Sequence, residues 1–586
     1  MEKEITIEIK HLEIIALLAF LLITLSLELW VNLNSHIVFG DEGFHARISQ
    51  VIAQKVEYPK WTPIGETDLE KSGYARPPLL NLLGASLFYI FGFNDVLLKI
   101  LNPFIGTILT GVAAFVLVKR IYDSKVALIA SVICVTIPSL VTYSVLYYTE
   151  VLSMFYFFTS VLTLVVAIKT EGKKYWILSG LLGGLSFLTK APAFALFPFV
   201  IVVFLYQFYK QGGFLKTFKK YVLWSLFFGL LIVPFFIRGY ILYGNPSCNL
   251  AVFPFFSTDG CAYSKTPAPQ YQFEGVAEQA GTEQNVFRMG LMSYFDFAYG
   301  NVWFALLGFL GGLVILLWRK KTEDVTILFA LLTLFLIIIR NYDTRAENLS
   351  RWLLPWTPLI ALIAGDYFAS AYDFVKSNWT LFGILLLVLI NVLILWNYFP
   401  FSLTEKAIIG IIIIISEFYF AITKKYKPAL AIAFIFILLV SFTNFYNKLE
   451  TMKGVKQFSP LFFQACDWVK QNTPMNIRIA NTIWGSATAY NCQRDIGGGG
   501  PDVTLSQNMT LMLPELKLAK ATHLFVQKFS ISWTDQKLSE KYPISYVRFL
   551  ESHPEHFKKI YENGPSLDEC YNAGGCDGTI LYEIIY

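Results

Sequence analysis

The polar residues that could do chemistry gather in one loop near the N-terminus. Residues 36–81 begin with two adjacent carboxylates, Asp41 and Glu42, and end with a cation before two prolines, Arg76-Pro-Pro. A positioned carboxylate can remove a proton, and an arginine can bind a phosphate through paired hydrogen bonds. Almost every other long segment is apolar, so we expect the chemistry to lie in this loop.

Further charged residues fall at the predicted helix ends that we assign to the same, outer side. They are Glu150 in YYTEVLSMF, Lys190 in FLTKAP, Arg238 in PFFIRGYILYGNP and Arg351 in NLSRWLLPWTP. Acidic and cationic side chains that converge at one membrane surface predict a site for an anionic lipid headgroup with a catalytic base beside it.

These residues also have purely structural interpretations. Asp41 could cap the interfacial helix that begins there, and Glu150 could only mark the boundary of a span. The cations could be helix-end side chains that extend to the membrane surface. Positive charge is normally depleted on the outer side, so several cations placed there singly favour a functional role.

The aromatic and histidine residues nearby have the same two interpretations. His45 lies one turn beyond Asp41 and could orient it, but a surface histidine without a partner is the simpler expectation. Tyr143, Tyr147 and Tyr148 are expected to belong to the aromatic belt of the membrane surface rather than to a sugar platform.

The composition excludes a soluble protein. The chain has 586 residues, of which 55% are hydrophobic and 15% are charged, and its mean hydropathy is +0.53. We therefore predict a polytopic α-helical membrane protein. The basic residues form short clusters between apolar runs, which indicates topology and gives no sign of nucleic-acid binding.

The apolar runs and basic clusters together predict thirteen membrane-spanning helices, with the N-terminus cytoplasmic and the C-terminus outside. The first run, 13–31, lacks a small-residue cleavage signature and is predicted to be a retained helix. The run 79–92 is short for a span and is predicted to lie along the outer membrane surface. The predicted helices are 13–31, 96–118, 126–143, 151–169, 176–190, 191–208, 221–238, 301–318, 325–340, 352–372, 380–398, 406–423 and 428–446.

This topology divides the chain into two parts. Residues 1–446 form the membrane part, with a first outer loop over 32–95, and residues 447–586 form a small extracytoplasmic α/β domain. That domain shows helical periodicity in FSPLFFQACDWVKQN and strand character in NIRIANTI, THLFVQK and GTILYEII. It has no metal-ligand spacing, phosphate loop or nucleophile elbow, so we expect a lid or docking platform over the membrane site.

The cysteines support this orientation. Of seven cysteines only Cys134 lies in a predicted span, and the other six fall in segments assigned to the oxidising side. Nearest-neighbour pairing would join Cys248 to Cys261, Cys466 to Cys492 and Cys570 to Cys576, but six cysteines allow about fifteen pairings.

The motifs in this order resemble the GT-C membrane glycosyltransferases. The resemblance rests on DE in the first outer loop, a basic residue before Pro-Pro-Leu, an acid after a tyrosine-rich turn, FLTKAP, an arginine followed by YGNP, and RWLLPWTP. The pattern is most similar to the branch that holds protein O-mannosyltransferases and bacterial lipid A aminoarabinose transferases. Two departures are Phe44 or His45 where the latter commonly carry arginine, and Arg-Pro-Pro in place of Lys-Pro-Pro.

The resemblance implies transfer of a sugar from a polyprenyl (dolichyl or undecaprenyl) phosphate to a hydroxyl on a protein, glycan or lipid, with inversion, at the outer face of the plasma membrane or the endoplasmic reticulum. No cofactor is expected. The chain lacks a segment like the WWDYG of oligosaccharyltransferases, which argues against en bloc transfer to asparagine and against a metal ion. The implied roles are catalysis for Asp41 and Glu42, phosphate binding for Arg76, Lys190, Arg238 and Arg351, and substrate contact for Glu150, His45 and Tyr148.

Two other classes of function stay open. A lipid or glycan transporter would bind the same headgroup without breaking a bond, but we detect neither an internal repeat nor charges or broken helices near mid-membrane. A scaffold whose outer domain binds glycans would give no reason for the acidic pair and the outer cations.

Overall fold

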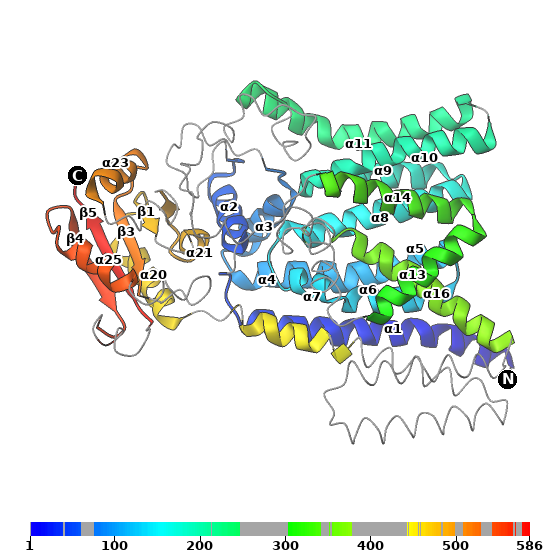
Figure 1. Cartoon of the computed structure of the whole chain (residues 1–586), viewed down its shortest axis with the longest axis horizontal. Coiled ribbons are helices and arrows are strands. Elements are labelled where there is room, and N and C mark those ends of the chain that lie inside the picture. Colours follow the sequence, from blue (N-terminus) through cyan, green and yellow to red (C-terminus); the bar gives the residue numbers. More distant parts are fainter. Residues whose placement is uncertain are drawn as a thin grey trace, which may run out of the picture.

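The structure is a computed structural model that describes most of the membrane part and the core of the C-terminal part. Helices lie side by side in an elongated bundle, and a sheet with its own helices lies beyond one end of it (Figure 1). The described residues are 2–38, 41–59, 76–212, 214–246, 303–340, 351, 354–377, 442–443, 445–454, 456, 459–481, 485–497, 508–528, 542–566, 569 and 577–586.

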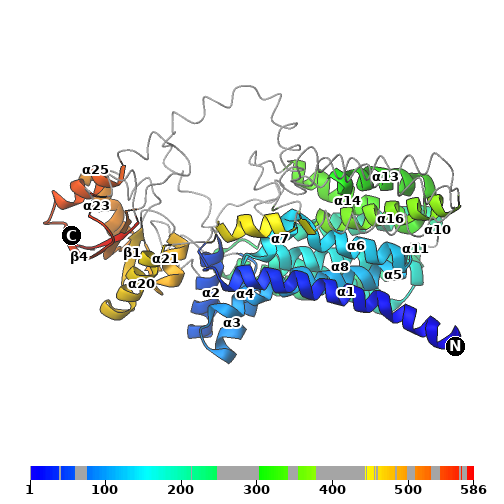
Figure 2. The same ribbon diagram turned by 90° about the horizontal axis from the view of Figure 1, so that it is seen from below.

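The bundle consists of helices that run roughly along one common direction, which two perpendicular views show (Figures 1 and 2). They are α1 (Glu2–Leu33), α4 (Asp95–Pro103), η1 (Phe104–Leu109), α5 (Thr110–Ile121), α6 (Ser124–Thr136), α7 (Pro138–Ser144), α8 (Thr149–Thr170), α9 (Lys173–Thr189), η2 (Ala191–Ala195), α10 (Leu196–Gln211), α11 (Phe214–Tyr243), α13 (Trp303–Arg319), α14 (Thr322–Arg340) and α16 (Trp356–Ser377).

Among the described residues, five helices are long and apolar enough to cross a membrane, or six if the bent pair α6 and α7 is one span. This pair covers the predicted helix 126–143 but bends by 59°. The bend falls at Ile137, which is extended because the proline that follows disfavours the helical conformation at that position. Thirteen crossings stay a prediction, since 380–398, 406–423 and most of 428–446 lie outside the described residues.

Helix α8 is the centre of the bundle and is buried over almost its whole length. Small polar residues allow its neighbour α9 to approach closely: Ser160 donates to the Ser179 carbonyl, and Ser186 donates to the Ser153 carbonyl. On the far side of α9, a Cβ at Gly180 would lie 2.5 Å from the Trp224 carbonyl oxygen of α11. Glycine is therefore required where α9 and α11 touch.

Two shorter helices lie at the outer end of the bundle. Helix α2 (Asp41–Lys55) is buried from Glu42 to Ile52, and it packs against α3 (Leu79–Phe91). Helix α3 covers the run predicted to be interfacial, and its last turn exposes Tyr89, Ile90 and Phe91. An exposed apolar end fits a position at the membrane surface, which stays a prediction.

The C-terminal part is a mixed five-stranded sheet in the order β2-β1-β3-β5-β4. Strand β1 pairs in parallel with β2 and β3, whereas β5 pairs antiparallel with β3 and β4. The predicted strand segments contain β1, β3 and β5, and the sequence analysis missed β2 and β4. The strands are β1 (Arg478–Asn481), β2 (Asp495–Ile496), β3 (His523–Gln527), β4 (Phe557–Asn563) and β5 (Thr579–Ile584).

Helices cover both faces of this sheet. Alternate residues of β3 point to opposite sides, so that Phe525 packs with α20 (Pro460–Asn472) and α21 (Gly485–Asn491), while Leu524 and Val526 pack with α23 (Met509–Leu518) and α25 (Tyr542–Glu551). The result is a three-layer α/β/α arrangement.

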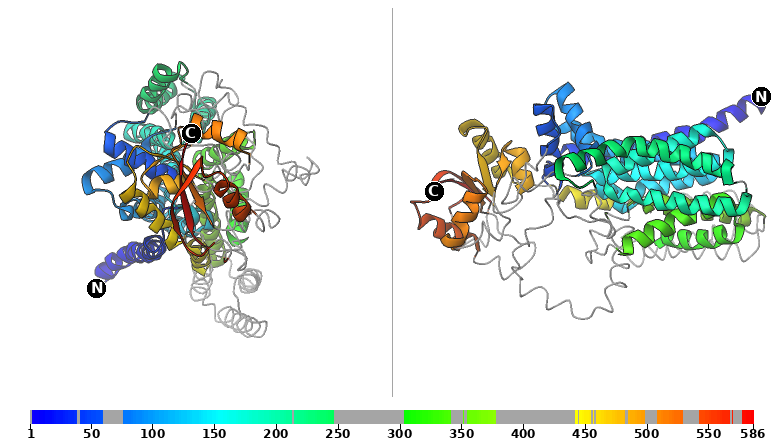
Figure 3. Two further views of the ribbon diagram at one scale, coloured as in Figure 1. Left: turned by 90° about the vertical axis from the view of Figure 1, so that its left-hand side faces the viewer. Right: turned by 90° about the horizontal axis from the view of Figure 1, so that it is seen from above.

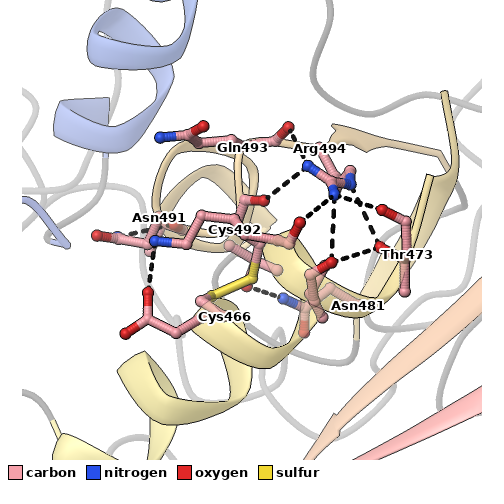
Figure 4. The surroundings of a disulfide bond; sticks show 12 residues. Cys466, Thr473, Asn481, Asn491, Cys492, Gln493 and Arg494 are labelled. Carbon is pink, nitrogen blue, oxygen red and sulfur yellow. Dashed lines mark hydrogen bonds and ion pairs between the residues drawn. A yellow bond between two sulfur atoms is a disulfide. The ribbon is translucent and has the colours of Figure 1, made fainter. Parts of the chain in front are cut away.

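A disulfide joins Cys466 of α20 to Cys492 just after α21 (Figure 4). Beside it the buried Arg494 donates to the carbonyls of Val469, Lys470 and Thr473, which end α20. This is one of the three nearest-neighbour pairs that the sequence suggests. Cys134 is a buried free thiol, and Cys248, Cys261, Cys570 and Cys576 lie outside the described residues.

We expect the disulfide to stabilise the C-terminal part measurably. The cross-link closes a loop with a sequence separation of 26 residues. Loop-closure entropy then predicts that Cys466→Ser with Cys492→Ser lowers the free energy of unfolding by about 3 kcal/mol. Peptide mapping without reduction should recover the two cysteines in one linked pair, and linkage of Cys466 to any other cysteine would contradict this pairing.

Candidate active site

The site is built around Glu150, which lies in the first turn of α8 and is buried. Its Oε1 accepts hydrogen bonds from Lys190 Nζ at 3.0 Å and from Arg351 Nε. Lys190 follows the end of α9. A charge removed from water needs a partner of opposite sign, and Glu150 has two. All three side chains line a small cavity of about 10 Å³, together with Ser153, Phe157, Pro192, Ala193 and Pro355.

Arg351 connects this cluster to Asp41. Its Nη2 donates to Asp41 Oδ2 at 2.6 Å, and its guanidinium lies 5.0 Å from the centre of the Tyr148 ring. The Tyr148 hydroxyl accepts the backbone N–H of Asp41 at 3.0 Å. The predicted residues Asp41, Tyr148, Glu150, Lys190 and Arg351 therefore lie together, although the sequence separates the first and last by 310 positions.

The electrostatic surroundings keep Asp41 ionised. Burial raises its pKa, but the charge of Arg351, the positive charge that His45 gains at low pH and the hydrogen bond from Arg351 outweigh burial and hold the pKa below its usual range. Asp41 is consequently a carboxylate at neutral pH and can accept a proton.

Glu42 faces away from this cluster although it is adjacent to Asp41. Its Oε1 accepts the backbone N–H of Tyr147 at 2.9 Å and a hydrogen bond from Lys456 Nζ at 3.0 Å. Consecutive residues of a helix do not share a face, so two neighbouring acids can have different partners. The sequence analysis missed Lys456, which lies just before the C-terminal sheet part and carries no motif.

His45 is not a surface residue, which corrects our simpler expectation. It is buried, and its Nδ1 lies 3.0 Å from Asn81 Oδ1 at the start of α3. An amide oxygen can only accept, so Nδ1 carries the proton. Burial lowers the pKa of His45 to about 4, so this imidazole is neutral at physiological pH.

The three tyrosines expected in a membrane-surface belt are instead buried. Tyr143, Tyr147 and Tyr148 are each 2% exposed. The Tyr147 hydroxyl donates to the Leu80 carbonyl at 3.0 Å. Tyr147 connects the turn before Glu150 to α2 and α3, and Tyr148 contacts the site directly through Asp41 and Arg351.

The two remaining predicted cations meet at Tyr58. The Tyr58 hydroxyl donates to the Arg76 carbonyl at 2.9 Å, and the Arg238 guanidinium lies 4.9 Å from the centre of the Tyr58 ring. Arg238 also donates to the Pro59 carbonyl at 2.8 Å. Arg76 lies 4.3 Å from the centre of the Phe44 ring, one residue from His45, and its charge acts on His45. Arg76 and Arg238 thus form a second cationic group beside α2.

Comparison with known proteins places this geometry in a recognised fold. A family model described as dolichyl-phosphate-mannose-protein mannosyltransferase matches residues 75–237, which include Arg76, Glu150 and Lys190. A search of curated proteins gave no significant match.

Solved structures match over nearly the whole chain. ArnT from Cupriavidus metallidurans in the apo state has a TM-score of 0.60 at 12% identity, and the match covers 97% of both chains. The archaeal oligosaccharyltransferase AglB from Archaeoglobus fulgidus has a TM-score of 0.57 at 13% identity, with 96% of this chain and 74% of that chain covered. The chain has the GT-C fold. The arabinofuranosyltransferase AftD from Mycobacteria shares this fold with a TM-score of 0.51 at 12% identity, over 97% of this chain and 40% of that one.

The two cations bonded to Glu150 explain why the site needs its central acid. Glu150→Gln would remove the buried carboxylate that Lys190 and Arg351 share, and Asp41 alone would face the two cations. Breaking a buried ion pair by removing one partner costs about 3–5 kcal/mol, so we expect a fall of several degrees in the unfolding midpoint of the purified protein.

A matched control is Glu171→Gln, since Glu171 pairs with Lys220 at 3.2 Å but its side chain is 52% exposed. Exposed pairs contribute about 0–1 kcal/mol, so this variant should unfold at nearly the wild-type temperature. Equal midpoints for the two variants would contradict the central role of Glu150.

Proposed function

We propose that the protein is a glycosyltransferase that moves a sugar from a polyprenyl phosphate to a hydroxyl group. The observation that carries the proposal is the convergence of one ionised carboxylate, Asp41, and two cations, Lys190 and Arg351, around the buried Glu150. A base beside an anion-binding group is the arrangement that this reaction needs.

The cations would bind the phosphate that joins the sugar to the lipid. Lys190 and Arg351 line the cavity, and Arg76 and Arg238, which both contact Tyr58, offer further positive charge beside α2. As the bond between the sugar C1 and the phosphate oxygen breaks, the electron pair leaves with the phosphate, and these cations stabilise the added charge. A phosphate held in this way leaves without protonation by a general acid.

Asp41 would act as the general base. The acceptor hydroxyl attacks C1 on the side opposite the phosphate, which inverts the anomeric carbon, and its proton passes to the Asp41 carboxylate. Glu42 already accepts hydrogen bonds from Lys456 and from the Tyr147 amide. Of the two adjacent acids we therefore assign the proton transfer to Asp41.

The polyprenyl chain would lie in an apolar groove between α10 and α11. The groove has a volume of about 430 Å³ and is lined by Phe197, Val200, Ile201, Phe204, Phe218, Tyr221, Val222, Ser225 and Leu226. Helix η2 contributes Pro192 and Ala193 to the cavity and continues directly into α10. A lipid whose phosphate is bound by Lys190 and Arg351, at the mouth of this cavity, would therefore extend along α10.

The related proteins support this class of donor. One ArnT structure is bound to undecaprenyl phosphate, and one AglB structure is in complex with a dolichol-phosphate and an inhibitory peptide.

We propose that the sugar acceptor is a protein, glycan or lipid outside the cytoplasm. We also propose that the membrane part has thirteen crossings and that residues 447–586 form a separate domain over the site. No cofactor or metal is expected.

The proposal is tested by offering a panel of polyprenyl-phosphate sugars to purified protein in lipid. Wild type should release polyprenyl phosphate, and Asp41→Asn should lower the rate by about a hundredfold or more because the base is lost. Donor binding should survive in Asp41→Asn and weaken in Arg76→Ala. Binding without release of phosphate from any donor by wild type would favour the transporter.

The pH dependence of transfer supplies a separate test. Asp41 acts only when ionised, and its pKa is lowered, so its contribution to kcat/KM is present at neutral pH and is lost only as the pH falls through that lowered pKa. His45, with a pKa of about 4, is neutral from physiological pH down to about that value and gains a proton only below it. The profile should thus be flat on the acid side until the pH is below the usual aspartate range.

Arg351→Gln removes the main charge that lowers the pKa of Asp41, while Glu150, His45 and Tyr148 remain around it. The acid limb of the pH profile should then move to higher pH, because the charge that lowers the Asp41 pKa is gone. An unchanged limb in this variant would contradict the assignment of Asp41 as the base.

A further inference from the structure

We infer that Lys456 is a positioning residue for the proposed reaction and that it acts through Glu42 to hold the start of α2. This inference rests on the proposed function. The Lys456 side chain is completely buried, although it lies in the segment between the bundle and the C-terminal sheet part. Removing a charge from water costs free energy, so a buried ammonium at this junction must have interactions that offset that cost.

Every N–H of the Lys456 ammonium has a partner. Its Nζ donates to Asn32 Oδ1 at 2.5 Å, to the Val145 carbonyl at 2.7 Å and to Glu42 Oε1 at 3.0 Å. A lysine ammonium carries three protons, so its capacity is filled. The three acceptors belong to the end of α1, the turn before α8 and the start of α2, so one side chain joins three segments.

The geometry of these contacts fixes the place of Asp41. Glu42 binds Lys456 and the Tyr147 amide through the same oxygen, which ties the first turn of α2 to the 145–148 turn. The next residue of that turn, Tyr148, accepts the backbone N–H of Asp41 and lies beneath Arg351. If Glu42 lost its partner, the Asp41 carboxylate would move relative to Arg351 and to the bound substrate.

Lys456 also balances charge beside the base. Without it, Glu42 would be a buried carboxylate next to Asp41, with Lys99 of α4 as the other cation whose charge acts on it. Asp41 is itself surrounded by Arg351, His45, Glu150 and Tyr148. Two adjacent acids can both stay in a buried helix turn because each has its own cation, Arg351 for Asp41 and Lys456 for Glu42.

The C-terminal part is attached to the same loop by independent contacts. Arg47 of α2 pairs with Asp495 at 2.9 Å, and Asn491 donates to the Ile37 carbonyl at 3.0 Å. Tyr490 donates to Asp95 at the start of α4. Helix α2 lies at the end of the bundle nearest to the sheet part (Figure 1), and the sheet part lies beyond that end in the right-hand view of Figure 3. Together these contacts join the C-terminal part to the loop that carries Asp41. Lys456 is the buried one among them, and it holds the start of α2.

The experiment is a double-mutant cycle on Lys456 and Glu42 in the full-length protein in lipid, with kcat and donor KM measured separately. Lys456→Met should lower kcat by about ten- to a hundredfold, the cost of a small misplacement of a catalytic group, and leave the donor KM within about threefold. Lys453→Met is the matched control, since Lys453 lies on the same segment but pairs with Glu450 near the surface. It should keep wild-type kcat.

The double variant separates positioning from general stability. If Lys456 acts through Glu42, then Glu42→Gln with Lys456→Met should have the kcat of Glu42→Gln alone, within about twofold, because no buried charge is left unpaired. This comparison holds even if Lys456→Met alone fails to fold. A further tenfold loss in the double variant, or wild-type kcat in a folded Lys456→Met, would overturn the inference.

Hydrogen exchange tests the same inference without turnover. In Lys456→Met, or in Glu42→Gln relative to wild type if the lysine variant does not fold, amides of residues 41–45 and 145–149 report on the same contact. Faster exchange is expected in Lys456→Met and not in Lys453→Met, and unchanged exchange in a folded Lys456→Met would count against positioning. If wild type transfers no sugar, the proposed function fails, whereas the exchange result still decides whether Lys456 positions the loop.

Discussion

The active-site region depends on one buried carboxylate, Glu150. A charge at the start of a fully packed helix is tolerated because the helix N-terminus favours it and because two cations are bonded to it. Those cations come from the end of α9 and from the segment before α16, and Arg351 in turn reaches Asp41 on α2. One acid therefore brings together four segments that are far apart in the sequence. Its two cations line a small cavity, and the base is bonded to one of them.

The charges of this site are nearly balanced before any substrate binds. Asp41 and Glu150 face Lys190 and Arg351, and Arg76 and Arg238 stand apart beside Tyr58. An incoming phosphate must compete with two carboxylates for Lys190 and Arg351, and the second cationic group offers it additional positive charge. This competition discriminates in favour of ligands whose negative charge can be bound by several cations at once. Because Arg351 contacts both the proposed phosphate site and Asp41, binding of the donor would also change the pKa of Asp41.

The members of the central cluster could be predicted from the sequence because their positions follow from the order of the membrane-spanning helices. Asp41, Glu150, Lys190 and Arg351 all fall at helix ends on one side of the predicted membrane, and helix ends on one side meet at one surface. Periodicity and composition likewise predicted the bundle, the sheet strands β1, β3 and β5, and helix α20. These features are local in the chain, so single-sequence patterns contain them.

The missed features depend on contacts between distant segments. Lys456 looks like any surface lysine in MKGVKQ, and its burial follows only from how the junction packs against α1 and α2. The different directions of Asp41 and Glu42 follow from the helical register of α2, and the burial of His45 follows from its contact with Asn81 of α3. The bend at Ile137 was the one feature with a local signal, since Pro138 follows it.

The most direct test of the central claim is a cryo-EM structure of the protein in lipid with polyprenyl phosphate bound. We expect phosphate density within hydrogen-bond distance of Lys190 and Arg351, with the Asp41 carboxylate facing the same space and the lipid chain along α10. A phosphate bound away from the Glu150 cluster, with Arg351 still joined to both Asp41 and Glu150, would contradict the account.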